Sequence, residues 1–101
     1  MVAFRLEFED MVLPSDTTAL RIPIATYRVQ FNKRFTFTQA RDISPYLQAL
    51  GISDVYASSY LKAVPGSDHG YDVADPTQLN PEIGSEDDYW DWIATLKSRG
   101  M

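Results

Sequence analysis

The stretch from Gly66 to Pro76 concentrates the residues of this chain that could do chemistry. Its eleven residues include two glycines, a tyrosine, three aspartates and the only histidine of the chain. Glycine lets the backbone turn at positive φ or approach a ligand closely. Aspartate and histidine can hydrogen-bond or titrate, and tyrosine combines a flat apolar face with a polar tip. A plain connection needs turn residues but no His-Gly-Tyr-Asp group, so we predict ligand contacts here.

The residues of this stretch support two kinds of catalytic centre only weakly, a zinc site and a carboxylate pair. A zinc site would use His69 with nearby aspartates, but one histidine without a second is a weak zinc signal. Asp72 and Asp75 could form a carboxylate pair for acid–base work. Their placement in a loop gives no geometry for such a pair, whereas aspartate commonly braces turns by accepting backbone N–H groups. We therefore predict no metal site here and favour bracing roles for the aspartates.

The length, composition and net charge of the chain exclude several classes of partner and site. Its 101 residues suffice for one small domain, and its 45% hydrophobic residues are ordinary for a globular protein. A net charge of −5 argues against nucleic acid or an anionic membrane as partner, because both require clustered Lys and Arg. The absence of cysteine excludes disulfides and thiolate nucleophiles. No apolar run approaches the ~20 residues of a membrane span, and the N-terminus lacks the pattern of a secretory signal.

Two strands are predicted before the loop. From Ala25 to Phe31 apolar and polar residues alternate, so residues 22–31 indicate a strand with Pro23 at its start. Residues 52–58 are short and partly apolar, which indicates a second, more buried strand. With a helix between them, the order is that of a βαβ unit, which implies parallel strands and a right-handed crossover.

The intervening helix carries one internal conflict. Thr36 and Gln39 fit a capping box that would begin a helix over residues 37–50. Its apolar face would consist of Ala40, Ile43, Leu47 and Leu50. Pro45 removes a helical hydrogen bond and clashes with the preceding turn, so we predict a kink or restart there.

Residues 59–84 are predicted to be a long loop without regular structure. Prolines and glycines interrupt them and no periodicity survives. Such a loop is uncommon in a compact domain unless it has a function. It follows the C-terminal end of a parallel strand, which is where α/β folds place their ligand sites.

The ends of the chain suggest an incomplete fold. Ser85 and Asp88 fit a second capping box before a helix over residues 86–99. Its apolar face would consist of Tyr89, Trp92, Ile93 and Leu96. Residues 1–21 are interpreted as a leader outside the main fold. Two parallel strands with two helices cannot cover both faces of a parallel sheet, so we expect the chain to be part of a larger α/β fold.

Two motifs together point to a known family. The chain contains Gly-Ser-x-His-Gly-Tyr-Asp-Val from Gly66 and Asn-Pro-Glu-x-Gly from Asn80. With residues 22–31, 46–53 and 55–58, they resemble the start of the maltooligosyl trehalose synthase family. That family belongs to the α-amylase family of glycoside hydrolases and transglycosidases. The resemblance covers residues 22–101 and leaves residues 1–21 outside.

The resemblance implies the first two βα units of a (β/α)₈ TIM barrel. The barrel parts would be residues 25–31 and 37–50 for the first strand and helix, 55–58 for the second strand, 59–84 for the second βα loop, and 86–99 for the second helix. A full barrel takes ~250 residues, so the α/β fold would be incomplete as given. Residues 22–101 would be the N-terminal part of the catalytic domain.

The family reaction implied by the resemblance acts on a maltooligosaccharide or a similar glycodextrin. It converts the reducing-end α-1,4 bond to an α,α-1,1 bond, which is an intramolecular transglucosylation toward trehalose. The implied mechanism is retaining, with a carboxylate nucleophile and a carboxylic acid, and it needs no metal or organic cofactor. In the family these acids come from later barrel strands, so no catalytic residue is expected in this chain, which alone would be inactive. The implied pathway partner is a trehalose-releasing hydrolase, and the implied location is cytoplasmic.

The resemblance also implies substrate-binding residues. Tyr71 matches a family tyrosine that stacks on the sugar at the cleavage site. His69 and Asp72 lie in the same motif, and Arg28 near the end of the first strand could reach the barrel mouth. The plainer alternatives are a loop-anchoring tyrosine and a structural histidine.

Two further residues, Asp75 and Asn80, are expected to brace the loop rather than to bind substrate.

Three functions stay open from the sequence. The chain could be the N-terminal piece of the glucosylmutase described above, or a fragment of another α-amylase-family enzyme such as a glucanotransferase or hydrolase. It could also be a non-catalytic saccharide-binding fragment.

Overall fold

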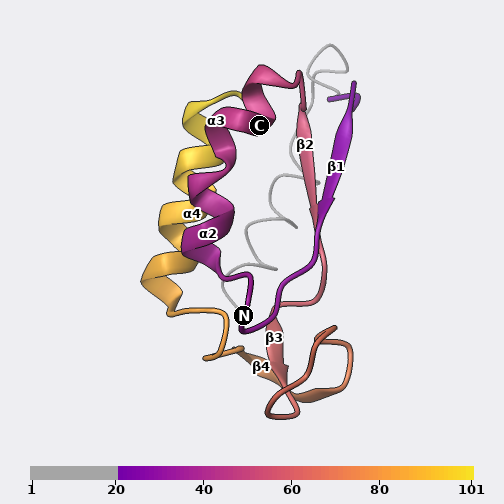
Figure 1. The fold of residues 1–101 in the computed structure, drawn as a ribbon, viewed down its shortest axis with the longest axis vertical. Coiled ribbons are helices and arrows are strands. Elements are labelled where there is room, and N and C mark those ends of the chain that lie inside the picture. Colours follow the sequence, from indigo (N-terminus) through magenta and orange to yellow (C-terminus); the bar gives the residue numbers. More distant parts are fainter. Residues whose placement is uncertain (1–20) are drawn as a thin grey trace, which may run out of the picture.

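The computed structural model describes residues 21–101 as an α/β arrangement. The elements are β1 (Thr26–Val29), α2 (Phe37–Asp42), α3 (Ser44–Ala49), β2 (Asp54–Ala57), β3 (Leu61–Ala63), β4 (Val73–Leu79) and α4 (Glu86–Ser98). The helices gather on one side of β1 and β2, and β3 and β4 lie beyond the ends toward which both strands point (Figure 1). The predicted α/β class is confirmed.

The predicted parallel βαβ unit is also confirmed, with a shorter first strand. β1 pairs with β2 in parallel, from Thr26 opposite Asp54 to Val29 opposite Ala57. The strand expected over residues 22–31 is limited to four residues because β2 offers only four partners. Alternation directs Val29 into the core, whereas Arg28 on the opposite face is exposed.

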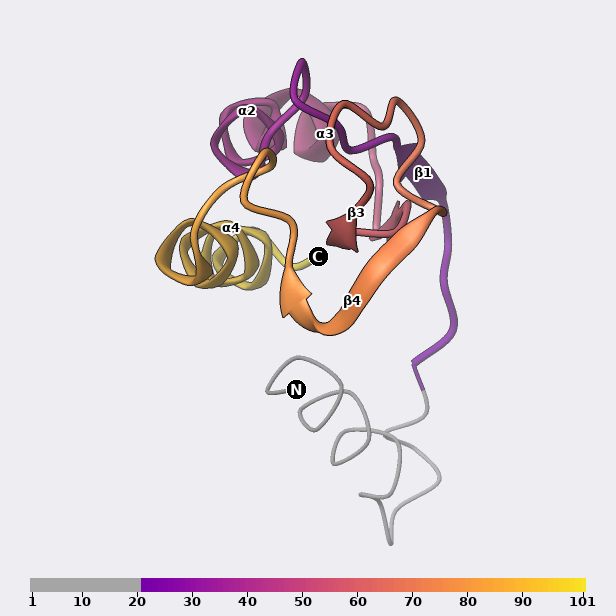
Figure 2. The same cartoon turned by 90° about the horizontal axis from the view of Figure 1, so that it is seen from below.

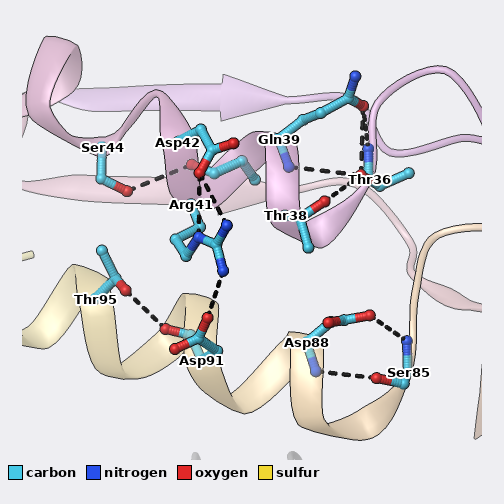
Figure 3. Close-up of polar contacts among 11 residues, drawn as sticks. Thr36, Thr38, Gln39, Arg41, Asp42, Ser44, Ser85, Asp88, Asp91 and Thr95 are labelled. Atoms are coloured by element: carbon cyan, nitrogen blue, oxygen red, sulfur yellow. Dashed lines mark hydrogen bonds and ion pairs between the residues drawn. The ribbon is translucent and has the colours of Figure 1, made fainter.

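The restart predicted at Pro45 is confirmed. α2 ends at Asp42, Ile43 stands between the helices, and α3 carries Pro45 in its first turn, where a missing N–H is tolerated. The capping box of Thr36 and Gln39 is present, and Figure 3 shows both of its hydrogen bonds. Leu50 departs from the expected apolar face because it lies past the end of α3, where its side chain is 54% exposed.

Helix α4 packs along α2 and is tied to it by a charged contact. Ser85 and Asp88 form the predicted capping box at its start. One turn further, the Asp91 carboxylate accepts from Arg41 Nη1 at 2.6 Å, which joins the two helices (Figure 3). Asp91 and Asp42 raise the pKa of the Arg41 guanidinium by hydrogen bonding, so the guanidinium keeps its charge at all ordinary pH values.

The core is an aromatic cluster centred on Phe31. This ring has no exposed surface and lies 5.2 Å from the Phe37 ring and 5.1 Å from the Trp92 ring, centroid to centroid. Tyr60 and Tyr89 extend the cluster through further ring contacts. The cluster therefore joins the segment after β1 to the start of α2, the segment after β2, and α4.

The prediction of an unstructured loop over residues 59–84 is wrong. β3 and β4 pair antiparallel within it, and Figure 2 shows β4 running alongside β3. The pairing is irregular: Leu61 lies opposite Leu79, but the next residue, Lys62, lies opposite Asp75. Pro76 occupies the unpaired part of β4, where proline is tolerated. Bulges of this kind destroy the alternation on which strand prediction depends.

The leader predicted over residues 1–21 lies outside the described residues except for its last one. The Arg21 guanidinium donates to the Ser53 carbonyl and lies 3.1 Å from the Asp54 carboxylate at the start of β2. Among the helices of residues 21–101, none has the length and apolarity that crossing a membrane requires.

Truncating the central ring tests the aromatic cluster. Because Phe31 is fully buried, Phe31→Ala is expected to lower the free energy of unfolding by about 3–5 kcal/mol. The matched control is Tyr46→Ala on the exposed face of α3, where the side chain is 61% exposed and the change should stay within about 0.5 kcal/mol. Urea denaturation of the two variants measures both values, and equal losses would contradict the assigned core.

Candidate functional site

The candidate site lies where β1 and β2 end. Three side chains reach from the first strand to the turn between β3 and β4. They belong to Arg28, Gln30 and Asn32, which occupy alternate positions in and after β1. Gln30 Nε2 donates to the His69 carbonyl at 2.8 Å, and Asn32 Nδ2 donates to the Asp68 carbonyl at 3.0 Å. Arg28 Nη2 donates to the Tyr71 hydroxyl at 3.1 Å. The structure therefore brings the predicted residues Arg28 and Tyr71 together across 43 positions of sequence.

Tyr71 presents its ring to solvent while its hydroxyl is held. The residue is 55% exposed, and its ring lies parallel to the His69 ring, with centroids 6.2 Å apart and planes at 11°. Arg28 restrains the hydroxyl at the far end of the ring. Two flat side chains thus make an exposed platform with fixed orientation, as stacking on a sugar requires.

His69 has a defined tautomer in this geometry. Its Nδ1 accepts the backbone N–H of Tyr71 at 3.0 Å, so the ring proton of the neutral imidazole is on Nε2. The side chain is 59% exposed, and Nε2–H is available as a donor. The Asp72 Oδ1 lies 4.0 Å from Nδ1.

Asp72 is held as an ionised acceptor. Ser67 Oγ donates to its Oδ1 at 2.5 Å, and this hydrogen bond lowers the pKa of the Asp72 carboxyl below its usual range, against partial desolvation. The same serine oxygen accepts the Gly70 N–H at 3.0 Å. A carboxyl with a lowered pKa is a poor proton donor at neutral pH.

Asp75 and Asn80 make local contacts of the kind that bracing requires, and their role stays a prediction. Asp75 lies in β4 and accepts the Thr77 N–H at 2.9 Å and its hydroxyl at 2.6 Å, which lowers the pKa of the Asp75 carboxyl. Asn80 is 4% exposed, and its side-chain oxygen accepts the Glu82 N–H at 3.0 Å. Both residues therefore satisfy backbone groups within the loop.

Four residues of the site are absent from the sequence prediction, namely Asn32, described above, and Gln30, Ser58 and Glu82. Gln30 and the buried Ser58 connect the strand ends, with Gln30 Nε2 3.3 Å from Ser58 Oγ. The Glu82 carboxylate accepts the Gly66 N–H at 3.0 and 3.2 Å, and so joins the two sequence motifs. The polar position of Gln30 in the alternation was the one available signal, because it places the side chain opposite the core face.

The arrangement suits a neutral, hydroxyl-rich ligand. It offers an aromatic face, an Nε2–H donor, an ionised carboxylate and a guanidinium, all at the end of parallel strands. In the described part of the chain, no group of three or more acidic or histidine side chains is placed to hold a metal ion. The chemistry that these residues can supply is therefore recognition through stacking and hydrogen bonding.

The comparisons with known proteins agree with this geometry. The α-amylase catalytic-domain family matches residues 42–101, which is more than half of the chain. The chain belongs to the α-amylase family. Within the family, a Mycobacterium tuberculosis protein named as a maltooligosyl trehalose synthase is 48% identical over 83 residues, covering 77% of this chain and 11% of that protein.

Solved α-amylase-family structures show the same similarity. The DSM5389 glycosyltrehalose synthase is 48% identical with a TM-score of 0.74, over 76% of this chain and 11% of that one. A maltooligosyl trehalose synthase is 44% identical with a TM-score of 0.77, over 79% of this chain and 11% of that one. The chain therefore spans about a ninth of the length of these relatives.

The site depends on one glycine more than on its neighbours. Gly70 has φ +79°, and a Cβ there would meet the Ser59 carbonyl oxygen at 2.7 Å. Gly66 has a similar φ of +82°, but its Cβ would meet nothing within 4 Å. Gly66→Ala is expected to cost about 1–2 kcal/mol of unfolding free energy from φ alone. Gly70→Ala should cost about 1–3 kcal/mol more because the backbone must shift. Denaturant unfolding of both variants measures the difference, and equal costs would contradict the close approach.

The pH dependence of the loop follows from Asp72. A carboxyl whose pKa is lowered by folding adds stability above its ordinary pKa, and that stability is lost as pH falls through the lowered value. Ser67→Ala removes the main cause of the shift, so the Asp72 pKa should rise toward its ordinary value. The stability difference between the proteins should be largest at neutral pH and shrink in acid.

An NMR titration of the side-chain carboxyl carbons checks this expectation. Asp75 is the internal control, because Thr77 and not Ser67 lowers its pKa. An Asp72 titration that does not move in Ser67→Ala, or an equal movement of Asp75, would refute the assignment.

Proposed function

We propose that this chain forms the first part of the catalytic barrel of an intramolecular glucosylmutase. The enzyme would convert the reducing-end α-1,4 bond of a maltooligosaccharide into an α,α-1,1 bond, which leads toward trehalose. The observation that carries the proposal is the Tyr71 ring, exposed at the ends of two parallel strands and fixed through its hydroxyl by Arg28. The 48% identity to a maltooligosyl trehalose synthase and to a glycosyltrehalose synthase supports this reaction over others of the family.

In this proposal residues 22–101 supply the first two βα units of a (β/α)₈ barrel. β1 with α2 and α3 is the first unit, and β2 with α4 is the second, with β3 and β4 inserted in its connection. Residues 1–21 are a leader outside the barrel. Active sites of such barrels lie at the C-terminal ends of the strands, where the platform is found.

Each site residue has a stated part in binding. Tyr71 places its ring against the C–H face of a glucose unit, and His69 donates Nε2–H to a sugar hydroxyl. Asp72, as a carboxylate, accepts from sugar hydroxyls. Arg28 orients Tyr71. Asp75 and Asn80 brace the loop.

We assign no catalytic acid to this chain. Retaining transfer needs a carboxylate nucleophile and a carboxylic acid about 5–5.5 Å apart on either side of the scissile bond. Asp72 and Asp75 have lowered pKa values and are therefore poor proton donors. After the glycosyl–enzyme forms, the anomeric hydroxyl of the released glucose attacks in place of water. This chemistry requires no metal or organic cofactor.

The reaction also has an implied place in metabolism. Its product carries a terminal trehalose unit, which a trehalose-releasing hydrolase would free. We place both steps in the cytoplasm, where the product of the first step would reach the hydrolase.

A segment exchange tests the proposal. Residues 22–101 replace the matching segment of the 48% identical glycosyltrehalose synthase, and the chimera is assayed on maltopentaose. We expect α,α-1,1 product, detected by NMR, in large excess over free glucose. Tyr71→Ala should lower kcat/KM by about 10–100-fold because the sugar is no longer positioned. Tyr71→Phe should have a smaller effect, and Tyr46→Ala on α3 is the unaffected control.

The alternatives give other results. A folded chimera that mainly releases glucose or exchanges α-1,4 segments would assign the chain to a hydrolase or a glucanotransferase. An inactive, folded chimera, with saccharide binding that Tyr71→Ala abolishes, would support a non-catalytic saccharide-binding fragment. Either result would overturn the glucosylmutase proposal.

A further inference from the structure

We propose that Gln30 is a positioning residue for the sugar platform. Its side-chain amide contacts both the backbone of His69 and the guanidinium that holds Tyr71. The inference rests on the proposed function, because positioning matters only if the platform binds the reacting sugar. It adds a residue that the sequence motifs do not contain.

The amide of Gln30 has one workable orientation. The His69 carbonyl can only accept, so it must face Nε2, which lies 2.8 Å away. The Arg28 Nη2 can only donate, so it must face Oε1, which lies 3.0 Å away. If the amide were reversed, Oε1 would face the His69 carbonyl oxygen, and Nε2 would face Arg28 Nη2. The first contact would then join two acceptors and the second two donors. Gln30 therefore locks the two partners in a fixed relation.

Both partners act on Tyr71. Arg28 Nη2 carries two hydrogens, so it can donate to Gln30 and to the Tyr71 hydroxyl at 3.1 Å together. On the other side, His69 Nδ1 accepts the Tyr71 N–H. The tyrosine is thus held at its backbone and at the far end of its ring, and Gln30 is the group common to both paths.

The base beneath Gln30 is rigid. Its neighbours Val29 and Phe31 are 4% and 0% exposed and belong to the core. The buried Ser58 hydroxyl accepts the Phe31 N–H at 2.8 Å and lies 3.3 Å from Gln30 Nε2, which ties the ends of β1 and β2 together. The core, and not the loop alone, therefore fixes the orientation of the platform.

Gln48 provides a matched control elsewhere in the chain. Its Oε1 accepts from Arg99 Nη1 at 2.8 Å, and its Nε2 donates to the Arg99 carbonyl at 3.5 Å. It therefore makes the same two kinds of contact as Gln30, between α3 and the end of α4, away from the platform. A purely structural role for a glutamine bridge predicts equal effects at the two positions.

The test uses the active chimera with its substrate maltopentaose. Gln30→Met preserves side-chain length and removes both hydrogen bonds, and it should lower kcat at least tenfold while KM changes less than threefold. Gln30→Glu retains the Arg28 contact but opposes the His69 carbonyl, so its kcat should fall between the wild-type and Gln30→Met values. Gln48→Met should leave kcat within twofold. Thermal midpoints identify any variant that fails to fold.

A double-mutant cycle separates positioning from general loosening. In the Tyr71→Phe background Arg28 has no hydroxyl to hold, so Gln30→Met should lower kcat by a clearly smaller factor than in the wild type. Equal factors in the two backgrounds, or equal losses for Gln30→Met and Gln48→Met, would overturn the inference. An inactive wild-type chimera would instead count against the proposed function, which is a distinct result.

Discussion

The burial of Phe31 is the constraint on which the rest of this structure depends. The ring lies two residues after β1, has no exposed surface, and touches rings from three other segments. Its position fixes where the first strand ends and which way the strand faces. Because side chains alternate along an extended chain, Gln30 must then point away from the core, toward the turn between β3 and β4. One apolar anchor thereby sets the direction of the polar residues beside it.

The site is built from segments that are distant in sequence. Its proposed binding residues lie together in one loop, whereas the residues that support them come from other parts of the chain. The proposed binding group is the contiguous stretch His69 to Asp72, in which His69 and Tyr71 are exposed, and local hydrogen bonds hold it in place. The supports, Gln30 and Glu82, come from either side and hold backbone groups of the loop. Such an arrangement keeps an exposed loop ordered without burying the surface that a ligand would use.

Much of the fold was predictable because it follows from local rules. The capping boxes at Thr36 and Ser85 and the restart at Pro45 are decided within a few residues. The β3–β4 pair was not predictable, because its register shifts remove alternation from the sequence. Gln30 and Glu82 were missed for a related reason. Their partners lie 39 and 16 residues away, and a single polar residue in a sequence does not indicate which distant residue it contacts.

The electrostatics of the loop separate binding from proton transfer. Hydroxyl donors from Ser67 and Thr77 lower the pKa values of the Asp72 and Asp75 carboxyls, so both stay ionised further into acid than an ordinary aspartate. A general acid for glycosidic cleavage requires the opposite, a carboxyl whose pKa is raised by burial or by a like charge. The serine and threonine that order this loop therefore also make its carboxyls unsuited to the role of general acid. Hydrogen-bond acceptance and proton donation place conflicting demands on one carboxyl, and in the proposed function this loop supplies acceptors.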